Sequence, residues 1–249
     1  MKKSQTMIAI EARNIRKVYK GGVEALKDVT FDVERGEIFS FLGPNGAGKT
    51  TTVRILTCVT KPTSGTVTVE GLRVPEQCED VRKIVSSVPQ EFSGFSDLSV
   101  YDNVAYFASL YGTESKVDDV IDSLGLNQYR DVKFKKLSGG YKRRVAIASA
   151  LVANPKVVFL DEPTVGLDPK ARRSLWEVIK SLKDGGVTVF LTTHYLDEAE
   201  KLSDRVAVLY QGRLVRTTTP DRLKEEFSKE TLEEAYLKLM EELGDEEGS

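Results

Sequence analysis

The most informative stretch of this chain is GPNGAGKT at residues 43–50, which matches the pattern GxxxxGK[ST] without a gap. Its glycines, Gly43, Gly46 and Gly48, let the backbone bend tightly enough for successive N–H groups to point at one anion. The apolar stretch EIFSFL precedes it at 37–42, and the helix-compatible stretch TTVRILTCV follows it. This strand–loop–helix order predicts a phosphate-binding loop at the N-terminal end of a helix.

The remaining residues of this phosphate loop supply the groups that a nucleoside triphosphate needs. Lys49 carries a positive charge for the β- and γ-phosphates, Thr50 offers a hydroxyl to Mg²⁺, and Thr51 can donate to an α-phosphate. The predicted nucleotide contacts are the loop and the residue after it, namely Gly43, Pro44, Asn45, Gly46, Ala47, Gly48, Lys49, Thr50 and Thr51.

Two carboxylates follow a second apolar strand, in the stretch VVFLDE at 157–162. Because ligands of open α/β sheets bind at the carboxyl ends of the parallel strands, Asp161 is predicted to lie beside the phosphate loop. We assign Asp161 to Mg²⁺, through water, and Glu162 to polarising an attacking water as general base. A solvated turn after the strand is the alternative, and the phosphate loop argues against it.

The order of patterns along the chain favours an α/β fold around a mostly parallel sheet. Further features are apolar strands at 156–160 and 187–193, amphipathic helices at 117–124 and 169–182, and a hairpin at 205–216. The segment 8–38 alternates at period two and is expected to form a separate antiparallel sheet. Thr231 and Glu234 fit a capping box for a short last helix, and the acidic EELGDEEGS after Met240 is expected to be a tail.

The composition of the 249 residues excludes several classes of protein. The 36 lysines and arginines against 38 acidic residues give a net charge of −2, which argues against a protein that coats nucleic acid or an anionic membrane. No stretch approaches ~18 consecutive apolar residues, so no membrane span is expected. Cys58 and Cys78 lie far apart in no metal-type spacing, so neither a disulfide nor a zinc site is expected and a reducing compartment fits. The single histidine, His194, excludes any mechanism that needs two.

The stretch LSGGYKRR at 137–144 narrows the class further, since it lies between the phosphate loop and VVFLDE. With its motifs in this order the chain resembles the ATP-binding cassette (ABC) ATPases, from about Ile8 to Met240. The resemblance implies that Ser138, Gly139 and Gly140 cover the γ-phosphate of ATP held by a partner subunit. ATP is therefore expected to drive a dimer with a second copy or with a homologous cassette. A plain helix start is the alternative for this stretch taken alone.

The resemblance also implies roles for four residues elsewhere. Tyr19 would stack on adenine, Gln90 would contact Mg²⁺ and the attacking water, and His194 would contact the γ-phosphate. Asp168, in GLD at 166–168, would link the two sites across the dimer interface, and it is also a plausible helix N-cap. Without the resemblance, Tyr19, Gln90 and His194 would be interpreted as ordinary core, loop or structural residues.

Two positions depart from the family pattern. Tyr141 stands where glutamine is usual, and a phenol cannot copy the two-sided hydrogen bonding of an amide, which puts a ribose contact in doubt. Cys58 stands where glycine is usual and is expected to be a small core residue.

The resemblance implies an α/β fold: a P-loop (RecA-like) parallel sheet core with an N-terminal antiparallel β subdomain and an inserted α-helical subdomain. The ABC ATPase domain would span 7–228, with the helical subdomain at about 91–153. Residues 229–249 would form a short C-terminal helix and an acidic tail.

The function implied is that of the ATP-binding and hydrolysing subunit of an ABC transporter, with ATP and Mg²⁺ as cofactors. It would lie in the cytoplasm, on the inner face of the cell membrane, and power a separate integral membrane permease. Residues 91–112 hold apolar side chains in a loop-like stretch and are the expected docking face, the alternative being core of the helical subdomain. The stretches NGAGKTT, THYLDEAEKLSDRVAVLYQGRLV and ETLEEAYLKL resemble single-cassette exporters of the drug-resistance type.

Two alternatives remain open. One is a cassette that regulates a membrane complex without transport, and the other is a soluble ABC protein that acts on nucleic acid or the ribosome. The single cassette and the short gap between the phosphate loop and LSGG argue against the second, and no nucleic acid partner is expected.

Overall fold

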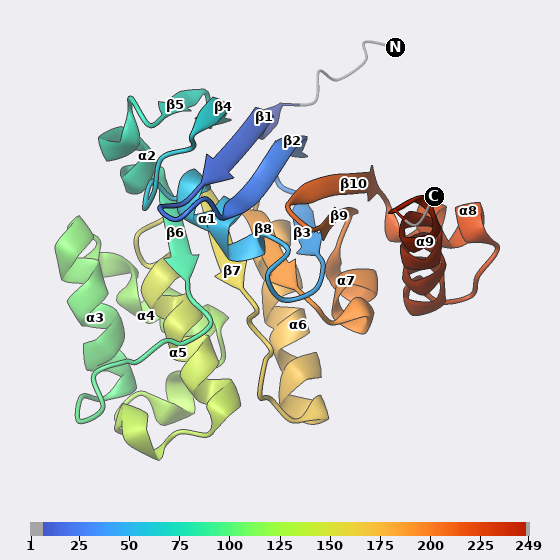
Figure 1. Cartoon of the computed structure of the whole chain (residues 1–249). Helices are drawn as coiled ribbons and strands as arrows, with labels where there is room; N and C mark the ends of the chain where they lie inside the picture. The colour runs from blue at the N-terminus through green and yellow to red at the C-terminus, as the bar shows by residue number, and fades with distance from the viewer. Residues whose placement is uncertain (1–6, 248–249) are drawn as a thin grey trace, which may run out of the picture.

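The structure, a computed structural model that describes residues 7–247, is built on two sheets (Figure 1). The larger sheet consists of β3 (Ile38–Leu42), β6 (Val85–Val88), β7 (Val157–Asp161), β8 (Thr188–Thr193), β9 (Arg205–Tyr210) and β10 (Arg213–Thr218). Its spatial order is β10–β9–β3–β8–β7–β6, and all of its ladders are parallel except that of the β9–β10 hairpin. The expected mostly parallel sheet is confirmed.

The smaller sheet is antiparallel throughout. It consists of β1 (Ile8–Val18), β2 (Glu24–Glu34), β4 (Ser64–Val69) and β5 (Leu72–Val74), in the order β2–β1–β4–β5. The separate antiparallel sheet expected from the early segment is thus present, and the chain after the phosphate loop adds β4 and β5 to it.

Phenylalanine rings join the two sheets. Every residue of β3, β7 and β8 is buried, as expected for apolar runs in a parallel sheet that is covered on both faces. Phe39, Phe41 and Phe190 of the larger sheet pack on Phe31 of β2, with ring centroids 4.9 to 6.1 Å apart. This packing fixes the smaller sheet against the strand that leads into the phosphate loop.

Helices cover both faces of the larger sheet and its edge (Figure 1). They are α1 (Lys49–Leu56), α2 (Cys78–Ile84), α3 (Val100–Tyr111), α4 (Val117–Ser123), α5 (Gly139–Leu151), α6 (Pro169–Asp184), α7 (Leu196–Leu202), α8 (Pro220–Phe227) and α9 (Leu232–Glu247). The helices α3, α4 and α5 lie between β6 and β7 in the sequence and gather on one side of the molecule, away from α8 and α9. None of the helices within residues 7–247 has the length and apolar character needed to cross a bilayer.

The C-terminal helix is longer than the sequence predicts. The expected capping box is present, because the Thr231 hydroxyl accepts from the Glu234 N–H and the Glu234 carboxylate accepts from the Thr231 N–H. The helix α9 then continues past Met240 to Glu247, so the prediction of a tail from Glu241 onward is wrong. Glutamate and leucine are good helix formers, and the acidic composition obscured this. Residues 248–249 of the expected tail lie outside the described residues.

The prediction of two unpaired cysteines is also wrong. Cys58 and Cys78 form a disulfide, with their Cα atoms 5.6 Å apart. Cys58 directly follows the last turn of α1 and Cys78 opens α2, so folding brings together residues that the sequence separates. The Arg82 guanidinium, also on α2, donates to the Cys58 carbonyl at 2.9 Å and holds the same two segments together.

Candidate functional site

The phosphate loop connects β3 to α1 and is packed closely against its neighbours. A Cβ on Gly43 would lie 2.2 Å from the backbone oxygen of Leu209. Gly48 has φ +110°, and a Cβ there would lie 2.7 Å from the Ala25 carbonyl oxygen. Both positions therefore require glycine.

The ammonium group of Lys49 lies inside the curve of this loop. Its Nζ donates to the Gly43 carbonyl at 2.7 Å and to the Pro44 carbonyl at 3.2 Å. The Glu162 carboxylate lies 3.4 Å away, and Lys49 is only 5% exposed. A buried ammonium with neutral partners and one carboxylate is well suited to exchange them for phosphate oxygens.

Asp161 ends β7 and lies beside the phosphate loop, as the sequence predicts. Its Oδ2 accepts from the Thr50 hydroxyl at 3.4 Å, and its Oδ1 accepts from the hydroxyl of Thr192 on β8. Carboxylate and hydroxyl oxygens are the ligands that Mg²⁺ prefers. No group of three or more His, Cys, Asp or Glu side chains suited to a metal occurs among residues 7–247, so a magnesium ion here would also need water and substrate oxygens.

Glu162 has a left-handed backbone conformation, with φ +47°. Its N–H donates to the Thr192 carbonyl at 3.0 Å, which fixes the turn after β7. One carboxylate oxygen of Glu162 faces Lys49, and the other lies 3.1 Å from Nδ1 of His194. A residue other than glycine with positive φ in a buried turn is a form of local strain that recurs at functional sites.

Tyr19 and Gln90 differ in their contacts with the phosphate loop and the carboxylates Asp161 and Glu162. The Tyr19 hydroxyl lies 3.3 Å from the hydroxyl of Thr51, so its half-buried ring borders the phosphate loop. Gln90 is exposed, in the segment after β6, and in the described part of the chain its side chain hydrogen-bonds to neither carboxylate. The structure therefore brings Tyr19 to the loop and leaves the Gln90 amide apart from it.

The residues of the LSGG stretch form a second group. Ser138 is the N-cap of α5 and is exposed together with Gly139. Asp168 is the N-cap of α6 and accepts from the N–H groups of Lys170 and Ala171 at 2.9 and 3.0 Å. Ser138, Gly140 and Asp168 line one cavity of about 220 Å³. Within residues 7–247 no hydrogen bond or ion pair connects this group to the phosphate loop.

Three residues near the centre were missed by the sequence analysis. Thr192 binds Asp161, and the only hint was a polar residue inside an apolar strand. Glu198 is fully buried, burial raises the pKa of its carboxyl, and the indole N–H of Trp176 donates to it at 3.1 Å. Arg143 is also buried, and burial lowers the pKa of its guanidinium to about 10, so it stays charged at neutral pH.

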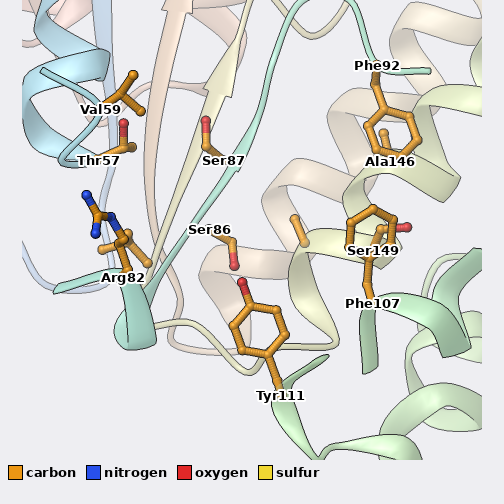
Figure 2. Close-up of a pocket in the computed structure, with 12 residues that line it drawn as sticks. Thr57, Val59, Arg82, Ser86, Ser87, Phe92, Phe107, Tyr111, Ala146 and Ser149 are labelled. Atoms are coloured by element: carbon orange, nitrogen blue, oxygen red, sulfur yellow. The ribbon is translucent and has the colours of Figure 1, made fainter. Parts of the chain in front are cut away.

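A groove of about 370 Å³ lies between the segment from the end of α1 to α2 and the helices α3 and α5 (Figure 2). Figure 2 shows Thr57, Val59 and Arg82 on one side and Phe92, Phe107, Ala146 and Ser149 on the other, with Tyr111 near one end. Exposed apolar side chains of the same region are Phe95, Leu98, Tyr106, Leu110 and Tyr111. Residues 91–112 therefore contribute both to the core, through Phe92 and Tyr101, and to the surface.

Comparison with known proteins identifies the family. A sequence model of the ABC transporter family matches residues 26–165. The chain is 39% identical to a daunorubicin/doxorubicin resistance ATP-binding protein of Streptomyces peucetius over 89% of this chain and 68% of that protein. It is 38% identical to a Nod factor export ATP-binding protein of Cupriavidus metallidurans over 86% of this chain and 72% of that one. A solved dimeric ATP-binding cassette with ADP and phosphate matches 84% of this chain and 98% of its own, with TM-score 0.74 and 28% identity.

The chain therefore belongs to the ABC transporter family. Within that family it is an ATP-binding cassette subunit with the P-loop NTPase fold, and it hydrolyses ATP to drive transport. The family expected from the sequence is confirmed.

Proposed function

We propose that the phosphate loop and the two carboxylates bind ATP with Mg²⁺ and that Glu162 is the general base for its hydrolysis. The observation that carries this proposal is the position of Glu162, whose two oxygens face Lys49 and His194. Lys49 and the loop N–H groups hold the phosphates, and Tyr19 borders the place for the adenine. His194 contacts the γ-phosphate, and Gln90 moves in to orient water once substrate is bound.

The magnesium ion would be held by Thr50 and Asp161, with Gln90 joining them. When bound, it supplies positive charge that stabilises the transferred phosphoryl group. Glu162 takes the proton of the attacking water, whose oxygen bonds to the γ-phosphorus while the bond to the β-phosphate oxygen breaks. The buried threonine, Thr192, holds both Asp161 and the Glu162 turn in place during this step.

The test of the base is Glu162→Gln, with the exposed Glu233→Gln on α9 as its matched control. We expect Glu162→Gln to bind ATP normally, to accumulate as an ATP-bound dimer and to lose ~10²- to 10⁴-fold in kcat, the usual contribution of a general base. Steady-state phosphate release and size-exclusion chromatography with ATP measure these effects. Hydrolysis by Glu162→Gln at the parent rate would show that the base is another group.

We propose in addition that Ser138, Gly139, Gly140 and Asp168 serve the ATP of a partner cassette. This proposal is supported by the exposure of Ser138, Gly139 and Asp168 and by the lack, among the described residues, of any hydrogen bond or ion pair from this group to the phosphate loop of its own chain. In the Glu162→Gln background, Ser138→Arg is expected to abolish the ATP-dependent dimer and to leave ATP binding by the monomer intact. The same substitution at Ser115, which lies in the short helical turn before α4, is the control. A stable dimer of the Ser138→Arg protein would contradict the assignment.

The proposed partner is an integral membrane permease, docked on the groove and on the exposed apolar residues of 91–112. The names of the relatives describe drug resistance and Nod factor export, so an export permease at the cytoplasmic face of the cell membrane is the form that we propose. The chain would then consist of an ATPase domain at 7–228, with the helical subdomain at about 91–153, followed by the C-terminal segment.

Copurification of the permease with variants of this face tests the docking proposal. Leu110 is 61% exposed on α3, and Leu237 is 54% exposed on α9, so the two offer a matched pair. Leu110→Asp is expected to abolish copurification and permease-stimulated ATPase activity while the basal activity of the isolated chain persists. Leu237→Asp is expected to retain the complex. Equal retention by both variants would place the permease elsewhere.

A further inference from the structure

A buried arginine connects the three segments on which the proposed mechanism depends. Arg143 lies on α5, in the helix that Ser138 opens, and is 8% exposed. Its Nη1 donates to the carbonyls of Pro89 and Gln90 at 2.7 and 3.1 Å. Its Nη2 donates to the carbonyl of Asp161 at 2.9 Å. One side chain thus joins the LSGG helix, the Gln90 segment and the end of β7.

Burying the Arg143 guanidinium costs more free energy than burying an apolar side chain at the same position would. All three acceptors are neutral carbonyls, and Nε of Arg143 is buried without a hydrogen-bond partner among the described residues. An apolar side chain of similar volume would avoid the loss of guanidinium hydration. The planar fork of an arginine, however, can fix several acceptors at set separations, which neither lysine nor an apolar residue can do. The contacts of Arg143 therefore fix the relative positions of these backbone segments more than they stabilise the fold.

The segment held by Arg143 continues into the groove. Ser86, Ser87 and Phe92 line the groove and are labelled in Figure 2. In the sequence they flank Pro89 and Gln90. The groove lining and the backbone that Arg143 holds against β7 therefore belong to one continuous segment, residues 86–92.

We propose that Arg143 is a positioning residue for ATP hydrolysis. It sets the Pro89–Gln90 backbone against the end of β7, so that Gln90 and Glu162 reach the attacking water together. It touches no nucleotide in doing so. Movement of α5 or of a partner in the groove changes the hydrolysis rate through this side chain. The inference rests on the proposed roles of Gln90 and Glu162.

Arg143→Met and Arg143→Lys test this role, with Arg205→Lys as the control. Arg205 is half-buried at the start of β9, where it binds Asp32 and Glu37 at the end of the strands opposite the phosphate loop. Because ~1 Å of misplacement can cost ~10²-fold in rate, we expect Arg143→Met to lower kcat about 100-fold. The KM for ATP should stay within about threefold, and dimer formation in the Glu162→Gln background should persist.

Arg143→Lys separates positioning from folding, because an ammonium keeps the charge and reaches fewer of the three carbonyls. We expect Arg143→Lys to have about one tenth of the parent kcat, which is higher than the kcat of Arg143→Met. We also expect it to reduce the stimulation by the permease more than the basal rate. The control should lower the melting temperature without changing kcat. If Arg143→Met does not fold, the kcat of Arg143→Lys decides, and a parent value overturns the proposal.

Other results would also overturn it. A raised KM with unchanged kcat in Arg143→Met would show that Arg143 contributes to ATP binding instead. An equal loss of kcat in Arg205→Lys would show that the effect of Arg143 is a general structural one. Failure of the proposed function gives a different result. Hydrolysis by Glu162→Gln at the parent rate would exclude Glu162 as the base, independently of the rates of the Arg143 variants.

Discussion

Glu37 gives the fold a dependence on pH that can be predicted in sign and size. It precedes β3, is 6% exposed, and accepts from the Glu34 N–H at 2.7 Å. Burial raises the pKa of its carboxyl from 4.5 to about 7, although the Glu34 N–H and the charge of Arg205 act in the opposite direction. The folded chain therefore keeps a proton on Glu37 at pH values where the unfolded chain has lost it.

The sign of the effect follows from this difference in proton binding. Between pH 4.5 and about 7 the folded state binds more protons at Glu37 than the unfolded state, so the free energy of unfolding falls as pH rises. The stabilising contribution is complete below pH 4.5 and is lost as pH rises through about 7. At about 1.4 kcal/mol for each pH unit, the loss is on the order of 3 kcal/mol. For a chain of this size, that corresponds to roughly 6–12 °C in melting temperature.

Glu37→Gln isolates this contribution from those of the other carboxylates. The amide oxygen can still accept from the Glu34 N–H, and the side chain no longer titrates. Thermal unfolding of both proteins at pH 5 and pH 8 is the assay. We expect similar melting temperatures at pH 5 and a variant that melts roughly 6–12 °C higher at pH 8. A difference between the two proteins that is the same at both pH values would refute the reasoning.

Three further changes test other parts of the structure. Gly43→Ala, whose Cβ would lie 2.2 Å from a backbone oxygen of β9, is expected to weaken ATP binding about tenfold or more in a fluorescent-nucleotide titration. Gly185→Ala is the control, because Gly185 has φ −76° and an added Cβ there would lie 3.4 Å from its nearest neighbour, so this variant should bind as the parent does. Reduction of the Cys58–Cys78 disulfide, whose partners are 20 residues apart, is expected to cost about 3 kcal/mol, and an unchanged melting temperature under reducing conditions would contradict this. His194→Ala is expected to lose about 100-fold in kcat and to keep ATP binding, and activity at the parent rate would remove His194 from the site.

Sequence reasoning located those parts of the site that are contiguous in the chain. The phosphate loop follows from glycine spacing, and Asp161 follows from its place at the end of an apolar strand. Both depend on local geometry that one stretch of residues determines. The order of strands and helices was likewise sufficient for the α/β class, since parallel strands need helical connections.

The features that sequence reasoning missed depend on contacts between distant segments. Arg143 binds carbonyl oxygens, which every residue carries, so no residue type at positions 89, 90 or 161 marks its partners. Cys58 and Cys78 pair only because α1 ends where α2 begins in space. Gln90 stays a prediction, because its side chain is exposed and makes no hydrogen bond to Asp161 or Glu162 among the described residues.

The disulfide also makes the chain a convenient subject for site-directed labelling. The sequence contains two cysteines, and their pairing leaves no thiol free in residues 7–247. A single cysteine introduced at Val59, on one side of the groove, or at Tyr111, near one end, would therefore be the one reactive thiol under non-reducing conditions. A photo-crosslinker or a spin label attached there would report directly on what occupies the groove, with no background from the rest of the protein.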